Sequence, residues 1–264
     1  MWVAVALCLL VQFLSSEAKV AVLPMLRHND GIVGGEDIDI SEAPYQVSLQ
    51  VNGRHSCGGT LVAKHIVITA AHCIGTLDAS KYQIRAGSSF SGRDGELYRV
   101  AKVLRHPNYG QNDYDSDIAI MWLSKPVRLS DKIETVEMKG VGEEVPDGDI
   151  VQVTGWGQTT PERSWVYNDR MLQRVLIPKI ADSKCRDAYD DLFTDNMLCA
   201  GLPEGGKNAC YGDSGGPLIH NGKLAGVVNF GYGCARPEWP AVYAKVSALR
   251  QWVDEQLKWT VPDL

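Results

Sequence analysis

Several common functional signals are missing from this chain of 264 residues. It has no Cys-x-x-Cys pair and no His-Glu-x-x-His segment, so neither a thiolate zinc site nor a zincin-type metal centre is predicted. It has no Asn-x-Ser/Thr sequon, which argues against N-glycosylation. It has no long basic run, and its formal net charge is −6, so nucleic acid is not an expected partner.

Long apolar runs are also scarce, because the only one, Val3 to Leu14, lies at the N-terminus. This run is too short to span a bilayer. The small residues Ser16 and Ala18 follow it at the positions that precede a signal-peptidase cut. We therefore expect residues 1–18 to be a signal peptide, the mature protein to be secreted and extracellular, and no membrane to be a partner.

Cysteine usage agrees with secretion. Cys8 would be removed with the signal peptide, and six cysteines would remain: Cys57, Cys73, Cys185, Cys199, Cys210 and Cys234. An even number in a secreted chain implies disulfides, although these residues alone leave the pairing open.

Helical periodicity is rare, and most of the chain is typical of short strands separated by turns rich in Gly, Pro, Asn and Asp. We predict strands over 45–51, 61–69, 96–104, 118–123, 150–154, 172–177, 224–228 and 241–246. A short helix is predicted over 182–190, and a clear amphipathic helix over 247–258 with Ser247 as its N-cap. Many short strands without long intervening helices predict antiparallel barrels or sandwiches, with a linker near 126–142.

One hexapeptide carries the clearest chemistry: Gly212-Asp213-Ser214-Gly215-Gly216-Pro217. Its glycines favour a tight loop that leaves backbone N–H groups free. A serine hydroxyl beside such groups can attack a carbonyl while the N–H groups stabilise the oxyanion. The alternative interpretation is an ordinary glycine-rich turn.

A serine nucleophile needs a base and an orienting acid. His72 follows a predicted strand within Thr69-Ala70-Ala71-His72-Cys73, where small residues leave room for the ring. Asp117 directly precedes an apolar run, which suits a buried carboxylate. An aspartate at the start of a strand is common, so this position alone would not decide its role.

Together these residues resemble the trypsin/chymotrypsin family of secreted serine endopeptidases. The resemblance rests on six motifs in the family's order: Ile32-Val33-Gly34-Gly35, Thr69 to Cys73, Asp117-Ile118-Ala119, Gly155-Trp156-Gly157, Gly212 to Pro217, and Gly231 to Cys234. It implies an all-β peptidase domain over 32–264, built from two six-stranded antiparallel β-barrels with the site between them. The first barrel would cover about 32–136, the second about 137–245, and a C-terminal helix 247–258.

The resemblance also implies the role of each site residue. Ser214 would be the nucleophile, His72 the general base and then acid, and Asp117 the residue that fixes the histidine tautomer. The backbone N–H groups of Gly212 and Ser214 would form the oxyanion hole. The family's disulfides would be Cys57–Cys73, Cys185–Cys199 and Cys210–Cys234.

Activation of a zymogen is a further implication of the resemblance. Residues 19–31 would be a propeptide, and a cut after Gly31 would free the Ile32 amine to pair with Asp213. Ser48 and His55 match family positions that hold this aspartate in the zymogen, although a strand serine and a loop histidine are an equally open interpretation. Gly31 is not basic, so either an activating protease of another type or a cut upstream followed by trimming is implied. Non-basic activation sites resemble those of arthropod digestive enzymes, including mite allergens.

The specificity pocket would have Asn208 at its base, where trypsins have aspartate, and Gly231 and Ala241 in its walls. We therefore expect chymotrypsin-like cleavage after large apolar or aromatic residues. Tyr211, Asn229 and Phe230 depart from the family's usual residues. These departures keep open a second interpretation, a catalytically weak homologue that acts as a binding or decoy protein.

The expected partners are protein and peptide substrates, protease inhibitors and the activating protease, and we expect a monomer. The resemblance implies no cofactor. No metal is expected, since the loop from Gly87 to Gly95 lacks the paired glutamates of calcium-binding relatives.

Overall fold

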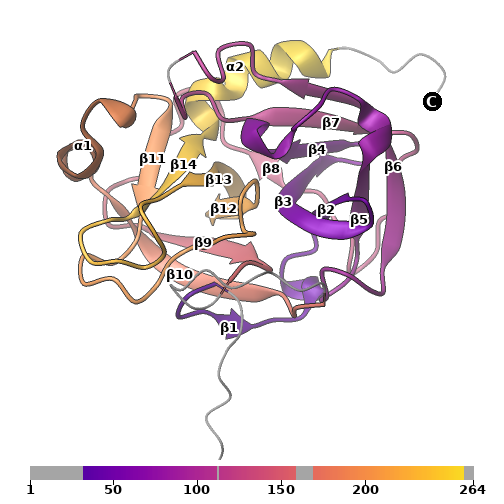
Figure 1. The fold of residues 1–264 in the computed structure, drawn as a ribbon, viewed down its shortest axis with the longest axis horizontal. Coiled ribbons are helices and arrows are strands. Elements are labelled where there is room, and N and C mark those ends of the chain that lie inside the picture. Colours follow the sequence, from indigo (N-terminus) through magenta and orange to yellow (C-terminus); the bar gives the residue numbers. More distant parts are fainter. Residues whose placement is uncertain (1–31, 112, 159–168, 259–264) are drawn as a thin grey trace, which may run out of the picture.

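A computed structural model describes residues 32–111, 113–158 and 169–258. They form two β-barrels that lie side by side, with the earlier half of the chain in one barrel and the later half in the other (Figure 1). The predicted signal peptide 1–18 and propeptide 19–31 lie outside the described residues.

The first barrel closes in the strand order β2-β3-β4-β7-β6-β5, and every neighbouring pair is antiparallel. Its strands are β2 (Gln46–Val51), β3 (Arg54–Ala63), β4 (Ile66–Thr69), β5 (Tyr82–Ala86), β6 (Glu96–Arg105) and β7 (Ala119–Leu123). The strand β7 is buried along its whole length, as its continuous apolar run predicts.

The second barrel closes through antiparallel pairs in the order β9-β10-β11-β14-β13-β12 and back to β9. Its strands are β9 (Ile150–Gly155), β10 (Gln173–Ile180), β11 (Met197–Ala200), β12 (Pro217–His220), β13 (Lys223–Phe230) and β14 (Ala241–Lys245). Two short strands extend this sheet: β1 (Glu36–Asp37) pairs with β10, and β8 (Glu137–Met138) pairs with β13. The prediction of two six-stranded antiparallel barrels is confirmed.

Two details of the predicted elements are wrong. The segment 61–69 is not one strand, because a turn at Lys64 and His65 separates β3 from β4. The C-terminal helix α2 (Val246–Leu257) begins before Ser247, and its N-cap is Lys245. Ser247 is buried inside the first helical turn, so it does not cap the helix.

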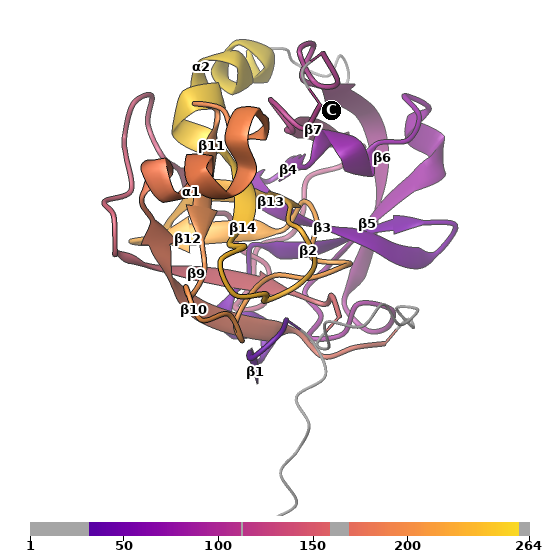
Figure 2. The same ribbon diagram turned by 60° about the vertical axis from the view of Figure 1, so that its left-hand side comes forward.

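The helix α2 joins the two barrels. It follows β14 of the second barrel, and its buried residues Val246, Leu249 and Val253 belong to an apolar cluster to which both barrels contribute. Figure 2 shows α2 at the top of the molecule, with β9 and β10 below it and β5 and β6 on the opposite side of the view. No helix in the described part of the chain is long and apolar enough to cross a membrane.

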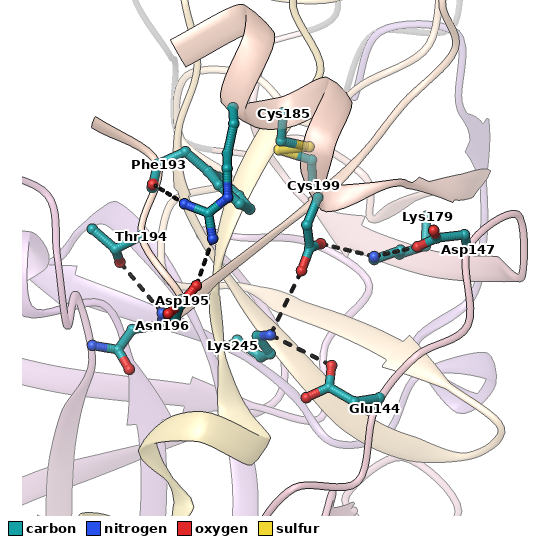
Figure 3. A network of polar contacts seen from close by, with 12 residues as sticks. Glu144, Asp147, Lys179, Cys185, Phe193, Thr194, Asp195, Asn196, Cys199 and Lys245 are labelled. Carbon is teal, nitrogen blue, oxygen red and sulfur yellow. Dashed lines mark hydrogen bonds and ion pairs between the residues drawn. A yellow bond between two sulfur atoms is a disulfide. The ribbon is translucent and has the colours of Figure 1, made fainter. Parts of the chain in front are cut away.

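The helix α1 (Asp182–Tyr189) is fastened to the second barrel by charges and a disulfide (Figure 3). Lys179 of β10 donates to Asp147 and, at 2.8 Å, to Asp182 at the start of α1. Cys185 of the helix is bonded to Cys199 of β11. These contacts fix the loop that follows α1, which leads into β11.

Candidate active site

His72 and Asp117 meet at one end of the first barrel. His72 lies in a short 3-10 helix, η2 (Ala71–Cys73), directly after β4, and Asp117 lies just before β7. The two strands pair, so the residues beyond their ends come together. Asp117 Oδ2 accepts from His72 Nδ1 at 2.6 Å, and Oδ1 accepts from the His72 backbone N–H at 2.8 Å.

This geometry sets the histidine tautomer. A carboxylate only accepts, so the proton of the neutral ring lies on Nδ1 and leaves Nε2 as an acceptor. Asp117 is fully buried, whereas 29% of the His72 side chain is exposed. The ring can therefore exchange a proton with a group in the adjacent cleft.

Ser214 reaches the same cleft from the second barrel. It lies in the turn before β12, and its carbonyl accepts from the Gly58 N–H of β3 at 2.8 Å, which ties the turn to the first barrel. Ser214 borders two cavities, one shared with His72 and one on the side of Gly231 and Ala241. No hydrogen bond between Ser214 Oγ and His72 Nε2 is formed in the described structure. Such contacts often tighten only when a substrate binds.

The backbone beside Ser214 presents two N–H groups. Gly212 has a φ of +97°, a conformation that favours glycine. The carbonyl of Tyr211 accepts from Gln158 N–H at 2.8 Å, and the carbonyl of Gly212 accepts from His55 Nε2 at 2.9 Å. Within the described residues, the N–H groups of Gly212 and Ser214 have no hydrogen-bond partner. They are therefore available to an oxyanion.

Asp213 points away from the cleft into the second barrel. Its carboxylate accepts from Gly157 N–H at 2.7 Å and from Cys210 N–H at 2.8 Å, and it is fully buried. Burial raises the pKa of Asp213 to about 7, against the opposing effects of the two backbone donors and Arg170. The carboxylate fits only because its neighbours lack side chains: a Cβ on Gly157 would lie 2.5 Å from Asp213 Oδ2.

The cavity beyond Ser214 has a volume of about 180 Å³ and no charged side chain among its described lining residues. Gly231 and Ala241 line it as expected, together with Asn229 and Phe230. The bonded pair Cys210 and Cys234 also contributes to the wall: its lining is Ala209, Cys210, Tyr211, Ser214, Val228, Asn229, Phe230, Gly231, Gly233, Cys234 and Ala241.

Asn208 differs from the expectation, because it is not among these lining residues. It is buried, and its side-chain Oδ1 accepts from the N–H of the next residue, Ala209, at 2.9 Å. The side chain is thus turned onto its own backbone, and the lining begins at Ala209.

Comparison with known proteins identifies the family. The model of the family described as trypsin matches residues 32–253. The chain belongs to the trypsin family. It is 57% identical over 228 residues to a vitellin-degrading protease of Bombyx mori. The alignment covers 86% of this chain and 85% of the relative. It is 40% identical over 250 residues to a trypsin of Phaedon cochleariae, with 93% of this chain and 94% of the relative covered.

Trypsin 5G1 of Aedes aegypti is similarly related, at 42% identity over 234 residues, with 87% of this chain and 86% of the relative covered. As a trypsin-family protein with this fold, the chain is a serine endopeptidase.

Its three disulfides join the pairs that the resemblance implied: Cys57–Cys73, Cys185–Cys199 and Cys210–Cys234. The first of these lies beside His72, and because both sulfurs are bonded they offer no thiolate to a metal.

The residues that the resemblance links to activation are all in the described part of this trypsin-family chain. Ile32 is fully buried, and Val33 pairs with Asn208, whose N–H donates to the Val33 carbonyl at 3.1 Å. Ser48 Oγ lies 2.9 Å from His55 Nδ1, while His55 Nε2 bonds to the Gly212 carbonyl. The pair thus supports the peptide next to Asp213. Burial lowers the pKa of His55 to about 4, which keeps the ring neutral.

Asn229 and Phe230, noted in the sequence as departures, both contact Tyr114. Asn229 Nδ2 donates to the Tyr114 carbonyl at 3.0 Å, and the rings of Phe230 and Tyr114 stack with centroids 4.5 Å apart. Sequence reasoning missed Tyr114, because these partners are far apart in the chain and no local pattern links them. Asn229 therefore binds the backbone near Asp117, and in the described structure its side chain forms no hydrogen bond with the Asp117 carboxylate.

Proposed function

We propose that this protein is a secreted, zymogen-derived serine endopeptidase that cleaves after large apolar or aromatic residues. Ser214 is the nucleophile, His72 the base and Asp117 the residue that orients His72. The proposed preference for apolar and aromatic residues rests on one observation, the uncharged lining of the cavity beside Ser214. The binding-only alternative is not favoured, because the histidine–aspartate pair and both N–H groups are in place.

The reaction follows from these positions. His72 Nε2 takes the proton from Ser214 Oγ as the oxygen attacks the scissile carbonyl. The carbonyl oxygen gains negative charge, which the N–H groups of Gly212 and Ser214 stabilise. His72 then gives its proton to the departing amine, leaving an acyl-enzyme. A water molecule, deprotonated by the same ring, releases the acid and regenerates Ser214.

Basic and apolar substrate side chains would meet the same uncharged lining in the cavity beside Ser214. A lysine or arginine would lose its hydration and find no carboxylate in the lining, which makes its burial unfavourable. An apolar side chain gains about 1.5–3 kcal/mol from the same burial. The methyl group of Ala241 narrows the cavity, so we expect tryptophan to be a poorer choice than tyrosine.

Activation would use Ile32 and Asp213. Cleavage after Gly31 would create an ammonium at Ile32, and the buried carboxylate of Asp213 would then gain a counter-charge. The activator would be a protease that accepts glycine before the cut.

Secretion is supported by the apolar N-terminal run and by the three disulfides, which form in oxidising compartments. The protein would act as a monomer on protein and peptide substrates and would bind protease inhibitors in the same cleft.

Peptide-library profiling of protein with a free Ile32 amine tests the specificity. We expect dominant cleavage after Tyr, Phe, Leu or Met, and none from a Ser214→Ala control. Dominant cleavage after Arg or Lys would overturn the proposed pocket. Vitellin is the natural substrate to test first, because the Bombyx mori relative carries that substrate in its name.

Asn208→Asp is a companion variant. It lies beside the lining residue Ala209, so a carboxylate there should raise the ratio of basic to aromatic cleavage. We expect the gain to be incomplete, because the side chain at this position is turned away from the cavity and Tyr211 and Ala241 still narrow the space.

A further inference from the structure

The proposed reaction depends on the relative position of the two barrels. His72 and Asp117 lie on the first barrel, whereas Ser214 lies on the second. A displacement of about 1 Å between reacting groups can lower a rate on the order of a hundredfold. Contacts between the barrels near Asp117 therefore bear directly on catalysis.

The backbone around Asp117 is strained. Ser116 is a buried non-glycine residue with a φ of +54°, in the left-handed region. The Ile118 N–H donates to the Ser116 carbonyl at 2.8 Å, which closes a three-residue turn centred on Asp117. Such conformations cost about 1–3 kcal/mol and persist only where the surroundings hold them.

Asp115 makes the first contact that holds this strained turn in place. Its carboxylate accepts from Thr194 Oγ1 and, at 3.2 Å from each oxygen, from Asn196 Nδ2. Asn196 Nδ2 also lies 3.4 Å from Ser116 Oγ, the strained residue itself. Thr194 and Asn196 come from the second half of the chain, in the loop between α1 and β11 (Figure 3).

The second contact is made by Asn229 of β13. Its Nδ2 donates to the Tyr114 carbonyl at 3.0 Å, and the neighbouring Phe230 ring stacks on the Tyr114 ring. Asn229 is almost wholly buried, so water cannot readily replace this bond. The segment 114–117 is thus held by the second barrel at both Tyr114 and Asp115.

We propose that Asp115 and Asn229 are positioning residues for the peptidase reaction. Together they fasten the turn that carries Asp117 to the second barrel, and so hold the Asp117–His72 pair in register with Ser214. This inference rests on the proposed roles of His72, Asp117 and Ser214. It assigns a function to Asn229 that differs from direct support of the aspartate.

Five variants of the activated enzyme test the proposal: Asp115→Ala, Asp115→Asn, Asn229→Ala, Thr194→Val and Asp195→Asn. Thr194→Val keeps the side-chain shape and removes one donor to Asp115. Asp195→Asn is the matched control, because Asp195 lies between Thr194 and Asn196 but is 93% exposed and pairs with Arg186. The kinetic constants are referred to active sites titrated with a fluorophosphonate. The low-field proton NMR signal of the His72–Asp117 hydrogen bond is recorded for each variant.

We expect Asp115→Ala to lower kcat about 10- to 100-fold with KM changed less than about twofold. Asn229→Ala should lower kcat to a similar extent, but its KM is not diagnostic, because Asn229 also lines the cavity beside Ser214. Thr194→Val should give a smaller loss of the same kind. The low-field signal should shift or broaden in these variants and stay unchanged in Asp195→Asn. Asp115→Asn, which keeps an acceptor for Thr194, should recover part of the rate.

Unchanged kcat in both Asp115→Ala and Thr194→Val would overturn the positioning role. So would a loss explained wholly by fewer titrated sites with the NMR signal unmoved, since that result describes a folding defect. A wild-type protein that neither reacts with the fluorophosphonate nor cleaves peptides would contradict the proposed function itself.

Discussion

At the scale of single residues, Asp213 shows how closely the site depends on glycine. The carboxylate occupies the space that a Cβ on Gly155 or Gly157 would fill. Its burial gives a carboxyl group that resists ionisation in the uncleaved chain. A buried cation would reverse this preference, and this is the physical basis for linking Ile32 to Asp213.

We predict that Gly157→Ala destabilises the protein by about 1–3 kcal/mol, because the added methyl overpacks a fully buried site. Peptidase activity should fall by at least about tenfold, since Asp213 adjoins Gly212 and Ser214. Gly140→Ala is the matched control, because its Cβ would meet only ordinary contacts, the nearest at 3.5 Å. Urea unfolding and peptide hydrolysis measure both effects, and equal behaviour of the two variants would contradict the prediction.

The pKa of Asp213 also predicts a pH dependence. Its folded value of about 7 lies above its ordinary value of 3.8, so the folded uncleaved chain holds a proton that the unfolded chain releases. The contribution of this group to stability should therefore fall as pH rises from about 4 to about 7. The penalty should approach about 4 kcal/mol at neutral pH.

Urea unfolding of the uncleaved Ser214→Ala chain, with and without Asp213→Asn, isolates this contribution. His55 titrates in the opposite sense, because its lowered pKa costs stability as pH falls from about 6.5 toward 4. The difference between the two chains removes that effect. A difference that does not change between pH 4 and 7 would refute the assignment.

At the scale of elements, α2 is the helix whose packing is easiest to test. Leu249 is buried in an apolar cluster that contains residues of both barrels. We predict that Leu249→Ala costs about 2–5 kcal/mol of unfolding free energy. The exposed Gln251→Ala in the same helix should be nearly neutral. Thermal unfolding of both variants measures this, and a similar loss in the two would contradict the packing account.

The elements also show where sequence patterns succeed. The apolar run before Leu123 and the amphipathic face of Leu249 and Val253 predicted β7 and α2 closely, because burial imposes those patterns. The short strands β5, β11 and β12 were not predicted. The four residues of β11 and of β12 are all buried, so they show no alternation, whereas β5 does alternate and was overlooked. Ser247 was wrongly taken as an N-cap because burial, rather than capping, determines its place.

At the scale of the whole molecule, the sequence identified the site but not the contacts that join the barrels. His72, Asp117 and Ser214 stand in motifs with local signatures, and the structure places them around one cleft. The bond between Asp115 and Thr194 spans 79 positions and has no local signature. The orientation of Asn208 was likewise hidden, because a side chain that turns onto its own backbone looks the same in sequence as one that enters a cavity.

We propose that catalysis depends on Ser214 as a nucleophile that His72 activates in a cleft between the barrels. The most direct measurement is the mass of the activated protein after reaction with a fluorophosphonate, followed by peptide mapping. We predict one adduct per molecule, located on Ser214, with the reaction slowed at least about a hundredfold in His72→Ala. Labelling of a different residue, or equally fast labelling of His72→Ala, would contradict the account.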